Sequence, residues 1–171
     1  TKSAYAYNSM GVALQEQGKL DQSIDTFTKA LSIKPDYAEA YYNMGFTLQE
    51  QGKLEKAIEA FTKALSIKPD YAEAHRNLSS IKKYNSDDKH FFQVKELYGQ
   101  KGLSEDTRCQ LSFALAKMYE DIGELDEAFA HLSEGNALRK KLLKYSINQD
   151  QELFTKLKNT QPKLLKNSLE I

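Results

Sequence analysis

Three histidines and one cysteine are the side chains in this sequence best suited to nucleophilic or metal chemistry. His75, His90 and His131 lie in separate predicted helices, and none has a second His or Cys at the spacing of three or four that a metal site requires. Cys109 lies in a helical segment without a nearby His, so we interpret it as a buried, neutral thiol. The glycines occur singly rather than in a phosphate-binding loop. The sequence therefore predicts no catalytic residue, no metal ligand and no cofactor.

Amide, aromatic and charged side chains at helical spacing are better candidates for function. Asn43 and Asn77 occupy equivalent places 34 residues apart, and an Asn amide both donates to and accepts from an extended peptide backbone. Tyr42 and Phe46, which we expect to be exposed side by side, add apolar anchors, and Arg76 adds a cationic one. We predict a peptide-binding groove lined by eight residues: Asn8, Val12, Tyr42, Asn43, Phe46, Glu73, Arg76 and Asn77. The alternative is that these side chains are solvated on a face without a ligand.

A tandem repeat supplies the elements that position these residues. Ala4–Tyr37 and Ala38–Tyr71 are each 34 residues long and are identical at 24 positions without a gap. In both units, two apolar blocks at helical spacing are separated by the same Gln-Gly-Lys-Leu turn. A fixed period of this length is typical of stacked helical hairpins, each made of a helix A, a turn and a helix B. In such a stack the A helices line the concave face.

Two glycines in each unit have separate roles in this hairpin. Gly11 and Gly45 lie inside helix A, where Gly costs about 1 kcal/mol relative to Ala. We therefore expect them to let helix B approach closely at its small residues. Gly18 and Gly52 end helix A, where a left-handed residue is needed.

The residues that recur in each unit follow a known pattern. In the second unit they are Tyr41, Met44, Gly45, Leu48, Gly52, Leu54, Ala57, Phe61, Ala64 and Pro69. This pattern resembles the tetratricopeptide repeat, with departures such as Met before the first Gly. The resemblance implies an all-α fold, a tetratricopeptide helical-hairpin solenoid wound as a right-handed superhelix, with about three to four helix pairs and a C-terminal helix. It also implies a non-catalytic module that binds a protein or a peptide.

Later segments depart from the repeat. We expect helix A of a third unit over 72–84, a connecting helix over 88–98, a helix over 126–144 that closes a degenerate unit, and a last helix over 148–159. The chain then divides into three parts: 1–84 with two near-identical units and helix A of a third, 85–145 with the connecting helix and the degenerate unit, and 146–171 with the last helix and a tail, a linker to a missing domain.

The degenerate part carries a second resemblance. The segments Phe113–Lys117, Tyr119–Gly123 and Glu134–Arg139 resemble bacterial proteins that join tetratricopeptide repeats to a sulfotransferase domain, over about Leu103 to Leu157. The resemblance implies that this chain is the non-catalytic N-terminal part of such a protein and presents substrate to a catalytic domain downstream. The loop that binds the phosphosulfate donor in that family does not occur in this sequence. The alternative is that these helices are a structural adjunct of the catalytic domain.

Composition narrows the choice of partner. The 24 basic and 24 acidic residues balance, which gives no electrostatic basis for binding nucleic acid. No apolar run approaches the roughly 18 residues that span a bilayer, and a single cysteine suits a reducing compartment. We therefore expect a cytoplasmic protein whose partner is a protein or a peptide. A homo-oligomer formed through the edges of the terminal repeats is the alternative.

Overall fold

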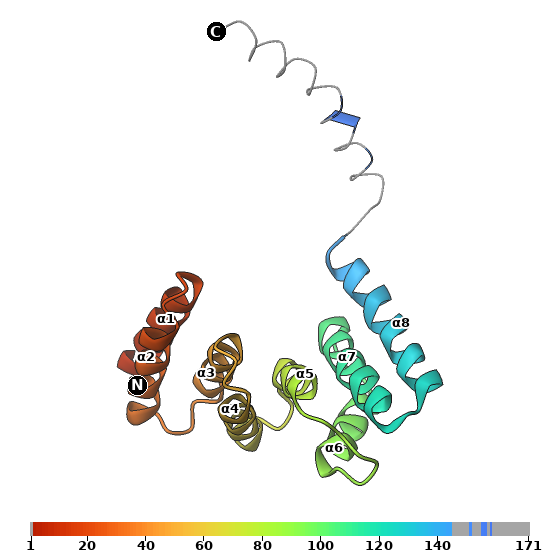
Figure 1. Ribbon diagram of the computed structural model, residues 1–171, viewed down its shortest axis with the longest axis horizontal. Helices are drawn as coiled ribbons and strands as arrows, with labels where there is room; N and C mark the ends of the chain where they lie inside the picture. The colour runs from red at the N-terminus through yellow and green to blue at the C-terminus, as the bar shows by residue number, and fades with distance from the viewer. Residues whose placement is uncertain (1, 145–150, 152–154, 157, 159–171) are drawn as a thin grey trace, which may run out of the picture.

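The computed structural model describes residues 2–144, 151, 155, 156 and 158, and this part of the chain is built from helices without a strand. The helices are α1 (Lys2–Glu16), α2 (Leu20–Ile33), α3 (Ala38–Glu50), α4 (Leu54–Ile67), α5 (Ala72–Ile81), α6 (Lys89–Tyr98), α7 (Glu105–Ile122) and α8 (Leu125–Leu142). They follow one another along an arc from α1 to α8 (Figure 1). The predicted all-α fold is confirmed.

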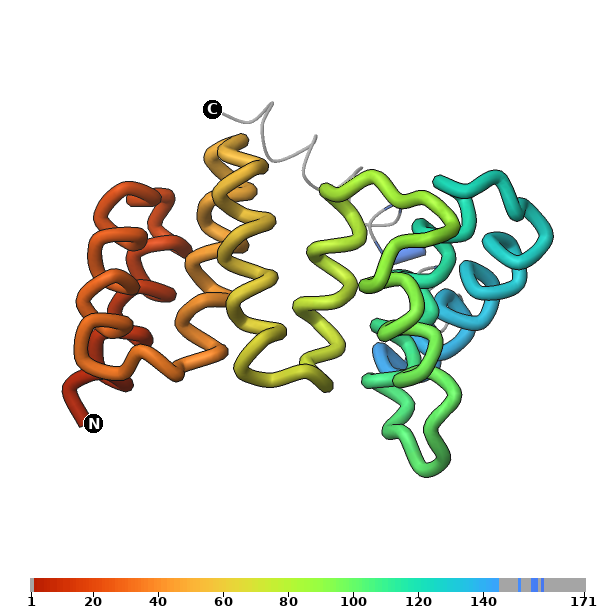
Figure 2. The backbone as a smooth tube through the Cα atoms, turned by 90° about the horizontal axis from the view of Figure 1, so that it is seen from below, coloured from red at the N-terminus to blue at the C-terminus, as the bar shows by residue number. Residues whose placement is uncertain are grey.

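Neighbouring helices pair into antiparallel hairpins, as the repeat predicts. α1 packs on α2, α3 on α4, and α7 on α8, while α3 also packs on α2 and α5 on α4. Figure 2 shows the hairpins side by side along the long axis. The helices A of the three hairpins are therefore α1, α3 and α7, and α5 is a helix A without a hairpin partner of its own.

Glycine and phenylalanine interlock inside the first two hairpins. A Cβ atom on Gly11 would lie 2.5 Å from the ring of Phe27, and one on Gly45 would lie 2.9 Å from the ring of Phe61. Both rings are fully buried. The expected close approach is thus present, but a large ring on helix B, rather than small residues alone, fills the space that the glycine leaves.

The turns also follow the prediction. Gly18 and Gly52 both have φ of +72°, in the left-handed region where a side chain is strained. Each ends helix A and directs the chain into helix B. The side chains of Asp88 and Ser104 accept hydrogen bonds from the backbone N–H groups of His90 and Thr107, which caps α6 and α7.

The third helix A is shorter than predicted. It ends at Ile81 instead of Tyr84, because Lys82 is extended with φ of −99° and ψ of 144°. The chain then turns inward and buries Tyr84, which is only 4% exposed. α7 packs along α5, and α6 packs against α7. The helix predicted over 126–144 is α8, whereas the helix predicted over 148–159 lies almost wholly outside the described residues.

Candidate peptide-binding groove

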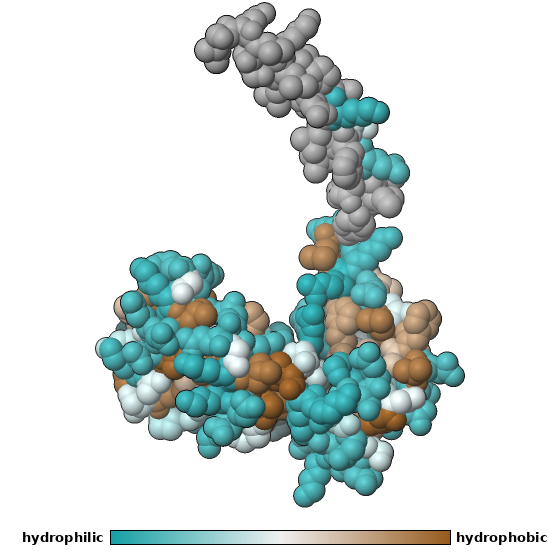
Figure 3. Space-filling model, viewed as in Figure 1, coloured by the Kyte–Doolittle hydropathy of each residue, from teal (hydrophilic) through white to brown (hydrophobic). Residues whose placement is uncertain are grey.

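The eight predicted groove residues lie on three A helices. α1 carries Asn8 and Val12, α3 carries Tyr42, Asn43 and Phe46, and α5 carries Glu73, Arg76 and Asn77. Seven of them are half-buried, and Phe46 is exposed over 37% of its surface. The molecular outline is hollowed between the α1 end and the α7–α8 end (Figure 3). We call the face formed by these residues the A-helix groove.

Hydrogen bonds join successive A helices across this groove. Asn43 donates from Nδ2 to Oδ1 of Asn8 at 3.1 Å. Asn77 donates in the same way to the hydroxyl of Tyr42 at 3.1 Å, and both pairs are separated by 35 residues. Because each bond orients an amide on a rigid helix, the two amides predicted to lie in register are held in place before any ligand arrives.

These amides keep capacity for further bonds. An Asn amide has two N–H donors and a carbonyl oxygen. The side chains of Asn43 and Asn77 each use one donor on a neighbouring helix, and their Oδ1 atoms accept no bond from the described residues. One turn beyond Phe46 on α3, Oε1 of Gln49 is buried and has no hydrogen-bond partner in the described part of the chain. Because that oxygen is shielded from solvent, the hydrogen-bonding capacity open to a ligand is that of Asn43 and Asn77.

Tyr42 departs from the prediction because it is packed rather than exposed beside Phe46. Its ring centroid lies 4.9 Å from that of Tyr71 and 5.9 Å from that of Phe61. Burial raises the pKa of Tyr42 above its usual value, and the charge of Glu73 raises it further. Tyr42 therefore offers a neutral hydroxyl to the groove, not an open aromatic face.

Arg76 is also held by a neighbour. Its Nη1 donates to Oε1 of Gln110 at 3.0 Å, and its guanidinium carbon lies 4.9 Å from the ring centroid of Phe113. Both partners belong to α7 and were missed by the sequence analysis. A signal existed, because Gln110 lies 34 residues after Arg76 and Phe113 occupies the place of Tyr42 in the degenerate unit.

Differences between the two near-identical units gather in two segments. They differ at ten positions, of which five lie on helix A, at 5, 8, 9, 12 and 13 in α1 and at 39, 42, 43, 46 and 47 in α3. The other five lie in the first half of helix B, within 21–26 and 55–60. The residues that interlock the hairpins are thus identical, while most of the helix A positions that differ belong to the groove.

Two histidines that the sequence predicts on separate helices are in direct contact. His75 and His90 meet edge to edge with nearly parallel ring planes and ring centroids 4.9 Å apart, and Nδ1 of His75 lies 2.7 Å from Nε2 of His90. The other nitrogens lie 2.8 Å from the carbonyl of Pro69 and 2.8 Å from the hydroxyl of Tyr84. No motif spacing predicts this pair, because His75 and His90 lie 15 residues apart on different helices.

The hydrogen-bond partners determine which ring nitrogens of this pair carry a proton. The Pro69 carbonyl only accepts, so Nε2 of His75 carries a proton and Nδ1 of His75 accepts from His90. The remaining nitrogen of His90 then accepts from Tyr84. Both rings are neutral, and burial lowers the pKa of His75. Burial, together with His75 and Lys82, lowers the pKa of His90 to about 3.

The pair therefore joins α5 to α6 and is not a metal site. Among the described residues, no group of three or more His, Cys, Asp or Glu side chains could hold a metal ion. Cys109 is buried, as predicted, and burial raises the pKa of its thiol. No helix in the described ranges is both long enough and apolar enough to cross a membrane.

Comparison with known proteins shows which repeat the first two hairpins resemble. The sequence model described as "Tetratricopeptide repeat" matches residues 2–70. No curated protein matches the sequence. This match covers the first two hairpins, which are thus similar to tetratricopeptide repeats, a unit that typically serves in protein–protein interaction, and it ends just before α5 begins at Ala72.

Solved structures are similar over a longer span. The crystal structure of MamA has a TM-score of 0.61 and 21% identity, over 83% of this chain and 81% of MamA. PilF of Pseudomonas aeruginosa has a TM-score of 0.65 and 20% identity, over 81% of this chain and 62% of PilF. A putative kinesin light chain of Podospora anserina has a TM-score of 0.61 and 12% identity, over 83% and 77%. At these identities the likeness shows the fold alone, and it confirms the predicted tetratricopeptide solenoid.

Proposed function

We propose that this tetratricopeptide repeat solenoid binds an extended segment of another protein in its A-helix groove. The observation that carries the proposal is the set of hydrogen bonds linking Asn8 to Asn43 and Tyr42 to Asn77 across three successive A helices. Amides that are already oriented lose little conformational entropy when a ligand binds, so their bonds contribute more fully to affinity.

An extended backbone suits the chemistry of the groove. A peptide presents N–H and C=O groups at regular spacing, and Asn43 and Asn77 offer the matching acceptors and donors. Phe46 is the exposed apolar side chain among them and supplies an anchor for one side chain of the ligand. Arg76, which is held by Gln110 and Phe113, adds a fixed positive charge.

A random peptide library displayed on phage tests this proposal. Peptides selected on the wild-type protein are expected to bind the double variant Asn43→Ala/Asn77→Ala at least tenfold more weakly, because two lost hydrogen bonds are worth about 1 kcal/mol each. Asn136→Ala is the matched control, since Asn136 is exposed on α8, outside the groove. Equal binding to wild type and to the double variant, both with native melting curves, would refute the groove.

A sulfotransferase domain that follows this chain in the full protein would give the groove a purpose, namely to present a bound protein substrate. Only the resemblance of residues 103–157 supports this finer proposal, and the structural-adjunct alternative predicts the same downstream domain. The two are separated by sulfation of a groove-binding peptide by the full protein. Loss of that reaction in the double variant, with sulfation of a free small acceptor unchanged, supports presentation.

Self-association is a second candidate function, favoured by one surface. On α8, Leu125 and Phe129 are 66% and 71% exposed, and they line an open apolar hollow with Phe113 of α7. Sedimentation velocity over a range of concentrations tests this candidate. A concentration-dependent dimer that Phe129→Ser abolishes would support it, and a monomer at every concentration would exclude it.

A further inference from the structure

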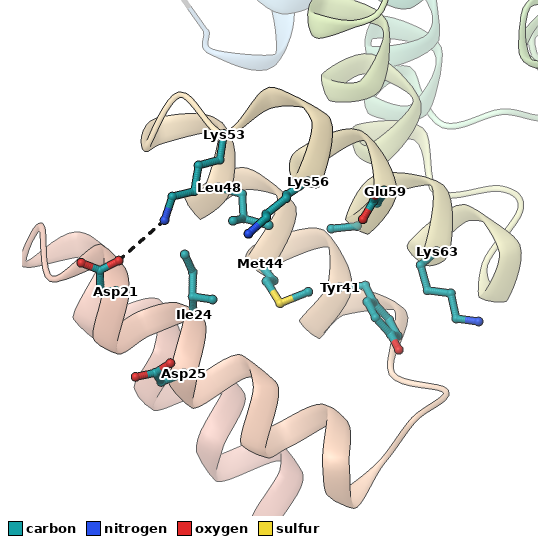
Figure 4. A pocket seen from close by; sticks show the side chains of 11 residues that line it. Asp21, Ile24, Asp25, Tyr41, Met44, Leu48, Lys53, Lys56, Glu59 and Lys63 are labelled. Carbon is teal, nitrogen blue, oxygen red and sulfur yellow. Dashed lines mark ion pairs between the residues drawn. The ribbon is translucent and has the colours of Figure 1, made fainter.

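A second hollow lies between the two B helices of the regular repeats, α2 and α4. It has a volume of about 660 Å³, within the range of ligand pockets in proteins. Figure 4 shows that α2 forms one wall, α4 forms the other, and side chains of α3 lie between them. We call it the B-helix trough, and it uses none of the eight residues of the A-helix groove.

The floor of the trough is apolar. Ile24 from α2 and Met44 from α3 are half-buried there, beside the more deeply buried Leu48. All three belong to the hydrophobic cluster that surrounds Phe61. Met44 is flexible and polarizable, a side chain that adapts to the shape of an apolar partner.

The two walls carry opposite charge. Asp21 and Asp25 project from α2. On the opposite wall, Lys56 and Lys63 project from α4 and Lys53 from the N-cap of that helix, with Glu59 as the acidic exception. At one end Asp21 is engaged, by Nε2 of Gln51 at 2.9 Å and by Lys53 at 3.9 Å. Asp25, Lys56 and Lys63 are exposed and have no ion-pair partner among the described residues.

Sequence differences between the units add to this contrast, although Lys53 and Lys63 have counterparts in the first unit at Lys19 and Lys29. Lys56 stands where the first unit has Gln22, and Ala60 on the floor stands where the first unit has Thr26. The second unit therefore adds one positive charge and removes one hydroxyl at the trough. These two positions belong to the second cluster of differences, in the first half of helix B.

We propose that the B-helix trough docks one amphipathic helix of a partner protein, with its apolar stripe on Met44 and Ile24, a basic flank beside α2 and an acidic flank beside α4. A helix laid in a groove buries an apolar stripe and leaves its flanks at the rim. There, basic side chains meet Asp25, and acidic side chains meet Lys56 and Lys63. Complementary rim charges select the partner and accelerate association. A nucleic acid or an anionic membrane lacks the basic groups that the α2 wall would attract.

Two synthetic helical peptides of roughly 18 residues, long enough to hold a helix in water, test the proposal. Both carry the same Leu stripe and the same numbers of Lys and Glu. The probe peptide has Lys on one flank and Glu on the other, whereas the control peptide has both mixed on each flank. Reversal of the helix direction cannot restore the pattern in the mixed peptide. Fluorescence anisotropy in low salt is expected to show at least roughly fivefold tighter binding of the probe, since exposed charge pairs contribute about 0.2–1 kcal/mol each.

One charge reversal locates the binding site. Asp25→Lys replaces the acidic side chain of the α2 wall that has no ion-pair partner among the described residues with a basic one, and it is expected to abolish the preference for the probe peptide. Glu55→Lys is the matched control. This substitution makes the same change of charge on α4, but Glu55 does not line the trough. Met44→Ala, checked for a native melting curve, is expected to weaken binding of both peptides roughly tenfold through lost apolar contact.

Three outcomes would overturn the proposal. They are equal affinity for the two peptides, a preference that persists in Asp25→Lys, and self-association of the chain that Asp25→Lys disrupts, which would make a second copy the occupant. Asn43→Ala/Asn77→Ala leaves binding to the trough unchanged, so failure of the A-helix groove and failure of the trough are distinguishable.

Discussion

In both the regular half of the molecule, α1–α4, and the irregular half, α5–α8, a glycine packs against an aromatic ring between the two helices of a hairpin. The two halves differ in which helix carries the glycine and which carries the ring. In the regular hairpins a glycine on helix A, such as Gly45, receives a ring from helix B, Phe61. In the last hairpin the glycine is on helix B and the ring is on helix A, since a Cβ on Gly135 would lie 3.2 Å from Phe113. A close helix crossing thus requires one large and one absent side chain, whichever helix supplies each.

The two halves also differ in polar contacts. In the described part of the regular half the one ion pair is Lys53 with Asp21, at 3.9 Å and the surface. In the irregular half Asp121, whose side chain is 1% exposed, accepts from Lys83, Lys117 and the backbone N–H of Tyr84. Both halves have an apolar core, which in the irregular half includes Phe91, Val94 and Met118. The irregular half adds buried polar clusters where the repeat is broken.

Phe61→Ala is expected to have the largest effect on this contrast. Phe61 is fully buried against Gly45, so its removal leaves a cavity that the rigid hairpin cannot fill. We expect the free energy of unfolding to fall by about 3–5 kcal/mol, measured by urea denaturation. A loss below about 1 kcal/mol, with an unchanged denaturant slope, would show that the regular half is not held by this interlock.

Asp121→Ala is expected to have the next largest effect and tests the irregular half. Burial alone would raise the pKa of Asp121, but hydrogen bonds from Lys117 and Lys83 outweigh it and lower the pKa. Its removal leaves the N–H of Tyr84 and the ammonium of Lys117 without their acceptor, at a cost of about 2–3 kcal/mol. Lys83→Ala is the control, because Lys83 is 80% exposed and should cost less than about 1 kcal/mol. Equal losses for both variants would contradict the importance of burial.

The sequence predicts the two halves unequally for a physical reason. In the regular half, the 34-residue period, Gly18 and Gly52 specify hairpins through local signals. The end of α5 depends instead on Tyr84 turning inward to reach His90 and Asp121, and no local pattern specifies that contact. In the groove, periodicity places Asn43 and Asn77 on one face, but the packing of Tyr42 against Tyr71 emerges only in three dimensions.

The histidine pair gives the irregular half a dependence on pH. Burial and neighbouring groups lower the pKa of His90 from 6.5 to about 3, so as pH falls the unfolded chain takes up a proton first. Stability should decline from about pH 6.5 downward, by about 2 kcal/mol at about pH 5 for one neutral histidine. Urea denaturation of wild type and of His90→Gln measures this. The Gln amide can donate to His75 and accept from Tyr84 without titrating, so the slope against pH should fall by about one proton. If the free energy of unfolding of His90→Gln depends on pH as steeply as that of wild type, other groups cause the dependence.

The smallest expected effect comes from Leu132→Ala, which completes the comparison with Phe61. Leu132 occupies the same register in the last hairpin as Phe61 does in the second, yet it is 43% exposed because the ring of that hairpin is Phe113 on the opposite helix. Its truncation should cost less than about 1 kcal/mol, since a partly exposed side chain leaves no enclosed cavity. The matched urea titrations of Phe61→Ala and Leu132→Ala therefore measure what decides how much a residue contributes to the free energy of unfolding. The deciding factor is either its position in the repeat or the presence of a glycine on the opposite helix. Similar losses of stability at the two positions would mean that the position in the repeat decides the contribution. The two halves would then not differ in this respect.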